Sequence, residues 1–496
     1  MRGVRGRGVG RGRSRVFSHA VIYVGGLVIQ RGLGVLLLPV STRILGVEQY
    51  GLAGTATALA ALLAIFYGLG INFPIVRTYY DDDPEAPRTA WAALLRVQAV
   101  IAVLLAGLTY LTGPTWSRIF GEFGWEEPAL RVAVLLALAT ALQTTAQGIL
   151  RAARRPRAFV SVTLVQVVVG AALGLLLAVD FGAGGYVTGL AVGSLAATLI
   201  SLGLSRRGPR WDFSAIVTGI RVGIPFMLHS LSTWGLDVSN RLFVALYLGV
   251  AAVGRLQVAY VMASVLTLLL QGIQSAWAPF FLGELSPEER RLTPPRMVVP
   301  VTTVLLGGTA ILVLCAPVLL DILVPKSFGG TEFIIPLVAS VSMARAAYLV
   351  AVVVLVDEKR SGIMSTASVA GALLNVGINV TLIPYAGLEA AALGTALGVM
   401  LQSIVVIANV GRRLDASMHL PRLLGLWLAG MGLLVLLSRL PETGWWLLIR
   451  GALVVCAGVF SVWEALRLRR ALEAIRGQGA VMANGSRTAN PATVGP

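Results

Sequence analysis

Arginines inside apolar segments are the residues of this sequence best suited to chemistry. Arg31 lies near the middle of the first long apolar run, beside Gln30, and that run contains no acidic residue. Arg345 lies in the middle of a later apolar run, again with no acid in the run. A guanidinium keeps its charge and can form paired hydrogen bonds with the oxygens of a phosphate group. Because a charge is costly in hydrocarbon, each of these arginines is expected to face a polar cavity or a partner.

An acidic–basic pair forms a second candidate site. Asp237 and Arg241 are one helical turn apart in an apolar run and are expected to share a face of the helix. Two roles are open for Asp237: it neutralises Arg241, or it binds a coupling H⁺ or Na⁺. Arg77 lies near the end of its run, where it either snorkels to the interface or meets an incoming anion.

Two prolines interrupt predicted helices. Pro225 and Pro279 lie inside apolar runs, where a proline removes a backbone hydrogen bond and kinks the helix. Each is either a hinge for moving parts or a kink without that role. The two cysteines, Cys315 and Cys456, also lie in apolar runs, which favours packing over a disulfide or metal site. No cofactor is expected.

The composition indicates that these runs meet lipid. The chain has 56% hydrophobic and only 13% charged residues, and its mean hydropathy is +0.82. A soluble domain has roughly a quarter of its residues charged. The net charge of +17 comes almost entirely from arginine, and the glycine–arginine start of the chain is similar to RNA-binding tracts. A basic leader attracted to anionic membrane lipid is the favoured interpretation, so nucleic acid is not expected as a partner.

The apolar runs predict an all-α integral membrane protein with about fourteen spans, since a helix needs about twenty apolar residues to cross a bilayer. Arginine is concentrated in alternate loops, which predicts a multi-pass protein of the cell membrane with both termini in the cytoplasm. The runs cover 20–45, 52–79, 89–111, 129–150, 159–179, 186–204, 219–248, 253–282, 297–320, 333–356, 363–383, 388–410, 423–440 and 445–466.

An internal repeat predicts how the spans are grouped. Leu-Gly-Val at 45–47, followed by Gly51, recurs at 248–250, followed by Gly254. The offset corresponds to six spans, so the two copies are expected to form parallel six-helix lobes. The predicted parts are a basic leader (1–19), the two lobes (20–210 and 211–413), two appended spans (421–467) and a disordered tail (468–496).

Several of these segments resemble the polysaccharide (Wzx-type) flippase branch of the multidrug/oligosaccharidyl-lipid/polysaccharide exporter superfamily. The segment 43–51 is similar to the turn after the first helix of that branch. The stretch from Pro225 through Asp237 and Arg241 is similar to its seventh helix, and 271–279 is similar to the end of its eighth. Lipid II flippases are among the branches that carry two additional spans.

The resemblance implies a carrier, not an enzyme, that moves a polyprenyl-diphosphate-linked oligosaccharide from the inner to the outer leaflet for surface polysaccharide synthesis. Alternating access of the two lobes would carry the polar head across the membrane. On this interpretation Arg31, Gln30, Arg77, Arg241 and Arg345 would contact the substrate.

Other functions stay open on the same sequence. The cargo could be lipid II, or the chain could be a cation-coupled multidrug antiporter, although such antiporters usually hold a buried acid in the N-terminal lobe. A membrane enzyme would need a catalytic acid or base and a larger outer loop. A scaffold would gain nothing from arginines in the middle of the membrane.

Overall fold

The computed structural model contains only helices and turns over the residues it describes, which are 8–72, 86–119, 124–153, 155–204, 213–283, 285–441 and 443–488. Ten helices within these ranges are long and apolar enough to cross a membrane, so the protein is a multi-pass membrane protein. They are α1 (Gly8–Gly68), α3 (Ala86–Leu111), α5 (Pro128–Ala152), α6 (Pro156–Leu204), α9 (Val250–Gly283), α10 (Pro287–Leu323), α11 (Ile335–Asp357), α12 (Ser361–Leu414), α13 (Leu420–Ser438) and α14 (Trp446–Thr488).

Three of these helices each cover two of the expected spans. Gly46 in α1, Gly182 in α6 and Gly387 in α12 have φ values of 66°, 54° and 66°, and each interrupts its helix between two predicted runs. Only glycine adopts such φ values without strain. The halves of α6 then fold back on each other, with Gly189 against Gly174 and Gly193 against Gly170. The total of fourteen spans remains a prediction.

The seventh expected span is not one continuous helix, which corrects the sequence interpretation. It consists of α7 (Phe213–Asp237) and α8 (Asn240–Leu248), separated by Val238 and Ser239. Asp237 and Arg241 therefore lie on either side of a break, and a shared helix face no longer follows from their spacing. The remaining elements are α4 (Gly113–Trp116) and the 3₁₀ turns η2 (Lys326–Phe328) and η3 (Thr331–Phe333).

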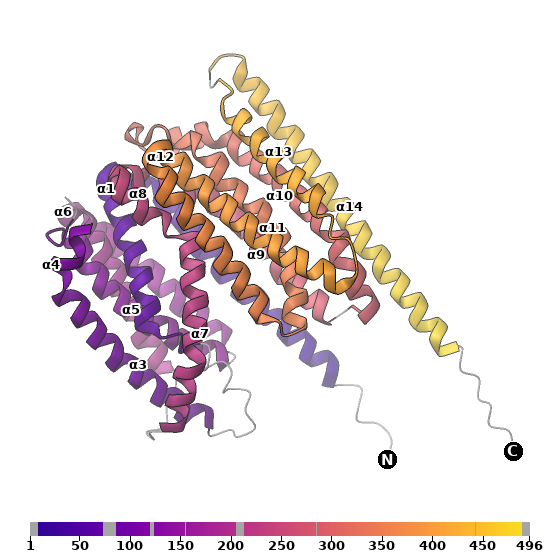
Figure 1. Cartoon of the computed structure of the whole chain (residues 1–496), viewed down its shortest axis with the longest axis horizontal. Coiled ribbons are helices and arrows are strands. Elements are labelled where there is room, and N and C mark those ends of the chain that lie inside the picture. The colour runs from indigo at the N-terminus through magenta and orange to yellow at the C-terminus, as the bar shows by residue number, and fades with distance from the viewer. Residues whose placement is uncertain are drawn as a thin grey trace. The chain divides into compact units, whose positions relative to one another are not determined.

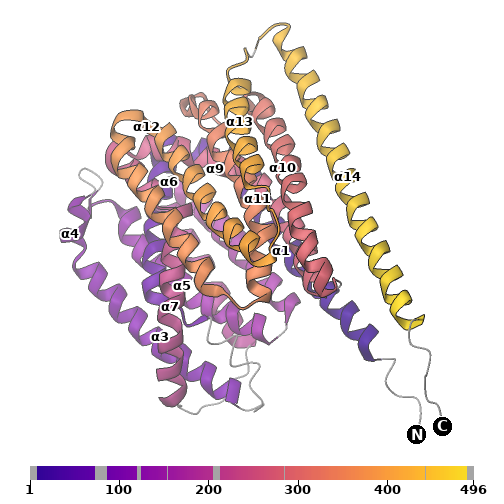
Figure 2. The same cartoon turned by 45° about the vertical axis from the view of Figure 1, so that its right-hand side comes forward.

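The chain forms two compact units. Unit 1 comprises Met1–Leu268, Leu319–Ile334 and Ala372–Thr395, and unit 2 comprises Leu269–Val318, Ile335–Gly371 and Ala396–Pro496. Within unit 1, α5 packs against α1, α3 and α6 (Figure 1). Within unit 2, α13 packs against α11, as Figure 2 also shows. The boundaries of the six-helix lobes remain a prediction.

The two copies of the repeated Leu-Gly-Val segment touch each other inside unit 1. Gly51 packs against the carbonyl oxygen of Val250, and Gly254 packs against the carbonyl oxygen of Val47. Gly249, like Gly46, has a positive φ value (82°). The repeat therefore encodes a reciprocal crossing of two main chains. Glycine is needed at Gly51 and Gly254 because a Cβ at either of these two positions would overlap the opposite backbone.

We predict that Gly51→Ala lowers the free energy of unfolding by about 1–3 kcal/mol, the usual cost of overpacking, because a carbonyl group cannot rotate away as a side chain can. Thermal unfolding of the purified protein in detergent measures the effect. Gly272→Ala is the matched control, since a Cβ at Gly272 in α9 meets nothing within 4 Å. Equal melting temperatures for the two variants would contradict the role of the crossing.

Candidate functional site

The break between α7 and α8 leaves backbone carbonyls without their usual helical donors. The N–H groups of Val238 and Ser239 both donate to Trp234 O, at 2.9 and 3.1 Å. Gly235 O therefore loses the N–H of Ser239, and the hydroxyl of Ser239 donates to it instead, at 2.6 Å. Inside a membrane each such carbonyl needs a replacement donor, because no bulk water reaches it.

Asn375 of α12 supplies further donors to the break. Its Nδ2 donates to Gly235 O at 2.8 Å and to Leu236 O at 3.1 Å, and the side chain is completely buried. This one amide ties the end of α7 to α12. Trp234 fixes the other side of α7, because its Nε1 donates to Ala58 O of α1 at 3.2 Å.

A second set of hydrogen bonds joins the start of α8 to α9 and α12. Asn240 Nδ2 donates to Tyr260 OH at 2.5 Å and to Thr395 Oγ1 at 3.2 Å. The hydroxyl of Tyr260 donates to Thr395 Oγ1 at 3.1 Å. We call the buried polar cluster the set formed by Ser239, Asn240, Tyr260, Asn375, Asn379 and Thr395, all of which belong to unit 1.

The buried polar cluster contains oxygens that accept no hydrogen bond. Oδ1 of Asn240, Asn375 and Asn379 is buried and has no donor among the described residues, and Nδ2 of Asn379 is buried without an acceptor. A Cβ added to Gly394 would lie 2.8 Å from Asn375 Oδ1 and 3.1 Å from Asn379 Oδ1, so these two oxygens converge beside that glycine. A buried acceptor without a donor is costly, which makes this arrangement suited to a bound cation or an ordered water.

Two arginines flank the buried polar cluster along the chain. The guanidinium of Arg241 lies over the ring of Tyr260, with Cζ 5.3 Å from the ring centroid. Arg255 of α9 is half-buried, and its Nε is buried without a hydrogen bond to any described residue. Sequence interpretation missed Arg255, because it lies near the start of a predicted span and resembles an interfacial arginine.

The structure describes only some of the predicted site residues. The side chains of Arg31 and Gln30 and the whole of Arg77 lie outside the described residues, so their roles remain predictions. Arg345 is half-buried in α11 of unit 2, whereas Asp237 and Arg241 belong to unit 1.

The two predicted hinge prolines lie within continuous helices. Pro225 is inside α7 and Pro279 is inside α9. Within the described parts of the long helices, the backbone departs from helical geometry at three glycines instead: Gly46, Gly182 and Gly387. The hinge role of the prolines is still a prediction.

Other arginines near helix ends have structural partners. Arg43 donates to Pro39 O and Ile322 O at 3.0 Å each, and thereby caps the C-terminal end of α10. Arg450, only 4% exposed, donates to Leu314 O at 3.1 Å and Pro441 O at 3.2 Å, and also to Leu440 O. An arginine within apolar sequence is therefore not by itself a sign of a substrate site.

Comparison with known proteins identifies the family. A family model described as polysaccharide biosynthesis protein matches residues 17–282, more than half of the chain. The chain belongs to this family. A search of curated proteins finds no match.

The chain has the fold of the multidrug/oligosaccharidyl-lipid/polysaccharide exporter superfamily. A structure of the lipid II flippase MurJ in an inward closed conformation matches with a TM-score of 0.69 at 13% identity, covering 91% of this chain and 99% of that one. Multidrug resistance transporters of the MATE family match in inward-facing and outward-facing conformations, with TM-scores of 0.61 and 0.55 at 15% and 16% identity. These two cover 81% of this chain and 99% and 95% of their own. At these identities the likeness concerns the fold alone.

We predict that Asn375→Ala lowers the free energy of unfolding by about 1–3 kcal/mol, because Leu236 O would be left buried without that donor. Thermal unfolding in detergent measures the loss. Asn409→Ala is the control: Asn409 lies in the same helix but donates only to Val405 O of its own helix, at 2.8 Å. A variant of Asn375 as stable as the control would show that the break does not depend on this amide.

Proposed function

We propose that this protein is a flippase that moves a polyprenyl-diphosphate-linked oligosaccharide from the inner to the outer leaflet by alternating access. Membership of the polysaccharide biosynthesis family carries the proposal, and the superfamily fold supports a transport mechanism. We further propose a location in the cell membrane with both termini in the cytoplasm, which the distribution of arginine in the loops supports.

The diphosphate of such a cargo requires cationic contacts along its path. Arg255 is a candidate, because its half-buried guanidinium has no hydrogen-bond partner for Nε among the described residues, and a bound anion would supply one. We assign similar roles to Arg31, Arg77, Arg241 and Arg345, with Gln30 as a hydrogen-bond partner for the cargo. Arg241 could contribute after leaving the face of Tyr260, since a cation–π contact is weaker than a paired bond to phosphate.

Transport on this proposal is coupled to a cation bound near Asp237. The C-terminal end of α7 and the oxygens of Asn240, Asn375 and Asn379 form an electronegative environment, and a half-helix C-terminus of this kind suits a cation. Amide oxygens are ligands for hard metal cations but are too weakly basic to carry a proton. The carboxylate of Asp237 could take either of the two coupling ions that the sequence leaves open, and the amide oxygens around it favour Na⁺.

Lipid II is the second candidate cargo. The match to the lipid II flippase covers 91% of this chain, against 81% for the multidrug transporters. The larger coverage favours a carrier with the two appended spans over a multidrug antiporter of the same fold. The two candidate cargoes share a polyprenyl diphosphate, so the same arginines would serve either one.

We predict that Arg255→Ala and Arg31→Ala each slow transbilayer movement of diphosphate-linked sugars about tenfold or more, because a lost charged hydrogen bond costs ~1.5–3 kcal/mol. The assay uses vesicles that contain the purified protein and either lipid II or a short polyprenyl-diphosphate oligosaccharide. Arg118→Ala, at an exposed arginine after α4, is the control and should flip at the wild-type rate. A folded wild-type protein that flips no diphosphate lipid would overturn the proposed function.

We also predict that Na⁺ raises the melting temperature of the wild-type protein relative to choline at the same ionic strength, since a ligand that binds only the folded state stabilises it. The shift should disappear in Asp237→Asn and in Asn379→Ala. Asn409→Ala should retain it. A shift of the same size in all four proteins would place the effect of Na⁺ elsewhere.

A further inference from the structure

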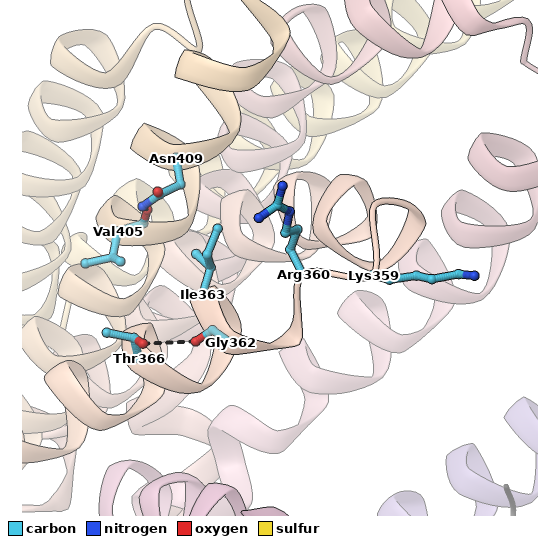
Figure 3. Close-up of a pocket in the computed structure, with 7 residues that line it drawn as sticks. All are labelled: Lys359, Arg360, Gly362, Ile363, Thr366, Val405 and Asn409. Atoms are coloured by element: carbon cyan, nitrogen blue, oxygen red, sulfur yellow. Dashed lines mark hydrogen bonds between the residues drawn. The ribbon is translucent and has the colours of Figure 1, made fainter.

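A pocket of about 470 Å³ lies in unit 2 where α11 turns into α12 (Figure 3). Lys359 and Arg360 of the turn line it, together with Ile363 and Thr366 from the start of α12. Val405 and Asn409, from the later part of the same helix, also line it. Figure 3 shows the guanidinium of Arg360 on the side of the turn that faces Asn409. The side chain of Lys359 extends in the opposite direction, away from the other labelled residues.

The backbone of the turn holds its two cations in a defined arrangement. Lys359 has a φ value of 57°, its N–H donates to Val356 O at 3.1 Å, and Arg360 N–H donates to Leu355 O at 2.8 Å. This is a Schellman arrangement, in which glycine normally occupies the position with positive φ.

The acidic residues of the turn are already paired with other arginines. Asp357 forms an ion pair with Arg290 at 3.0 Å, and Glu358 forms one with Arg413 at 3.1 Å. The side chains of Lys359 and Arg360 make no ion pair or hydrogen bond with any residue in the described part of the chain. Lys359 and Arg360 are therefore not paired with the two acidic residues that precede them in the turn.

The other polar side chains of the pocket, Thr366 and Asn409, are uncharged, so neither cancels the charge of the two cations. The first turn of α12 has no side-chain cap, which leaves its N–H groups and the positive end of the helix dipole at the same turn. All of these features favour an anion.

The apolar part of the pocket distinguishes a lipid from a free anion. Ile363 and Val405 form an apolar wall beside the cations, and Val356 and Val369 on the adjoining helical turns are exposed. Exposed apolar side chains beside basic groups are typical of the boundary between head groups and acyl chains.

We propose that this pocket binds the phosphate head group of an anionic phospholipid, with Arg360 on the phosphate, Lys359 adding positive charge at the rim, and an acyl chain along Ile363 and Val405. The site is separate from the residues assigned to the cargo, and it does not depend on the flippase function. Its lipid would be a resident of the leaflet that adjoins the turn between α11 and α12.

Native mass spectrometry of the full-length protein in neutral detergent tests the proposal, with phosphatidylglycerol and phosphatidylcholine as probes. We expect the wild type to retain phosphatidylglycerol in preference, and Arg360→Gln to weaken its apparent Kd about tenfold, as loss of one charged contact implies. Arg412→Gln removes a charge from an exposed arginine of the same helix outside the pocket and should bind like the wild type.

A second variant separates binding from folding. Lys359→Gly removes a cation but relieves the positive φ, so it should weaken retention of phosphatidylglycerol while raising the melting temperature in phosphatidylcholine. Equal retention of the two lipids by the wild type, or equal losses in Arg360→Gln and Arg412→Gln, would overturn the proposal. Displacement of the lipid by millimolar inorganic phosphate would overturn it in favour of a free-anion site.

Discussion

A broken helix in a membrane persists only if other groups replace the hydrogen bonds that the break removes. Between α7 and α8 those groups are the hydroxyl of Ser239 and the amide of Asn375. Because Asn375 commits its nitrogen to two carbonyls, its oxygen is turned toward Gly394 and the neighbouring oxygen of Asn379. The nitrogen of Asn375 thus supports the broken helix, while its oxygen is one of the two that converge beside Gly394.

Arginine serves different needs at different places in this chain. Arg43 donates to a carbonyl oxygen at the end of α10, and Arg450 donates to the carbonyl oxygens of Leu440 and Pro441, just after α13. The distinction between a structural and a ligand-binding arginine lies in whether protein acceptors already surround the guanidinium. By that criterion Arg255 in unit 1 and Arg360 in unit 2 are the described arginines best placed to accept an anion.

The helical membrane fold and the family could be predicted from apolar runs, loop arginines and short motifs, because these depend on local composition. The positions of Gly46 and Gly249 could be predicted as well, since both belong to a visible repeat. The break after Asp237 could not, because the nearby Gly235 is only one of many glycines in the apolar runs and Asn375, which stabilises the break, is far away in the sequence. Arg255 could not be singled out either, because the lack of a hydrogen bond to its Nε among the described residues depends on which residues surround it in space.

The reciprocal crossing of Gly51 and Gly254 also constrains how the protein is made. Unit 1 is completed by residues up to Thr395, so the first spans leave the ribosome long before their partners exist. At 5–20 residues per second, the chain from Gly51 to Gly254 takes roughly 10–40 s to synthesise. During that interval the glycine-lined surface of α1 has no matching backbone to receive it. Until Gly254 has been synthesised, the surface of α1 around Gly51 must therefore be covered by lipid or by the insertion machinery.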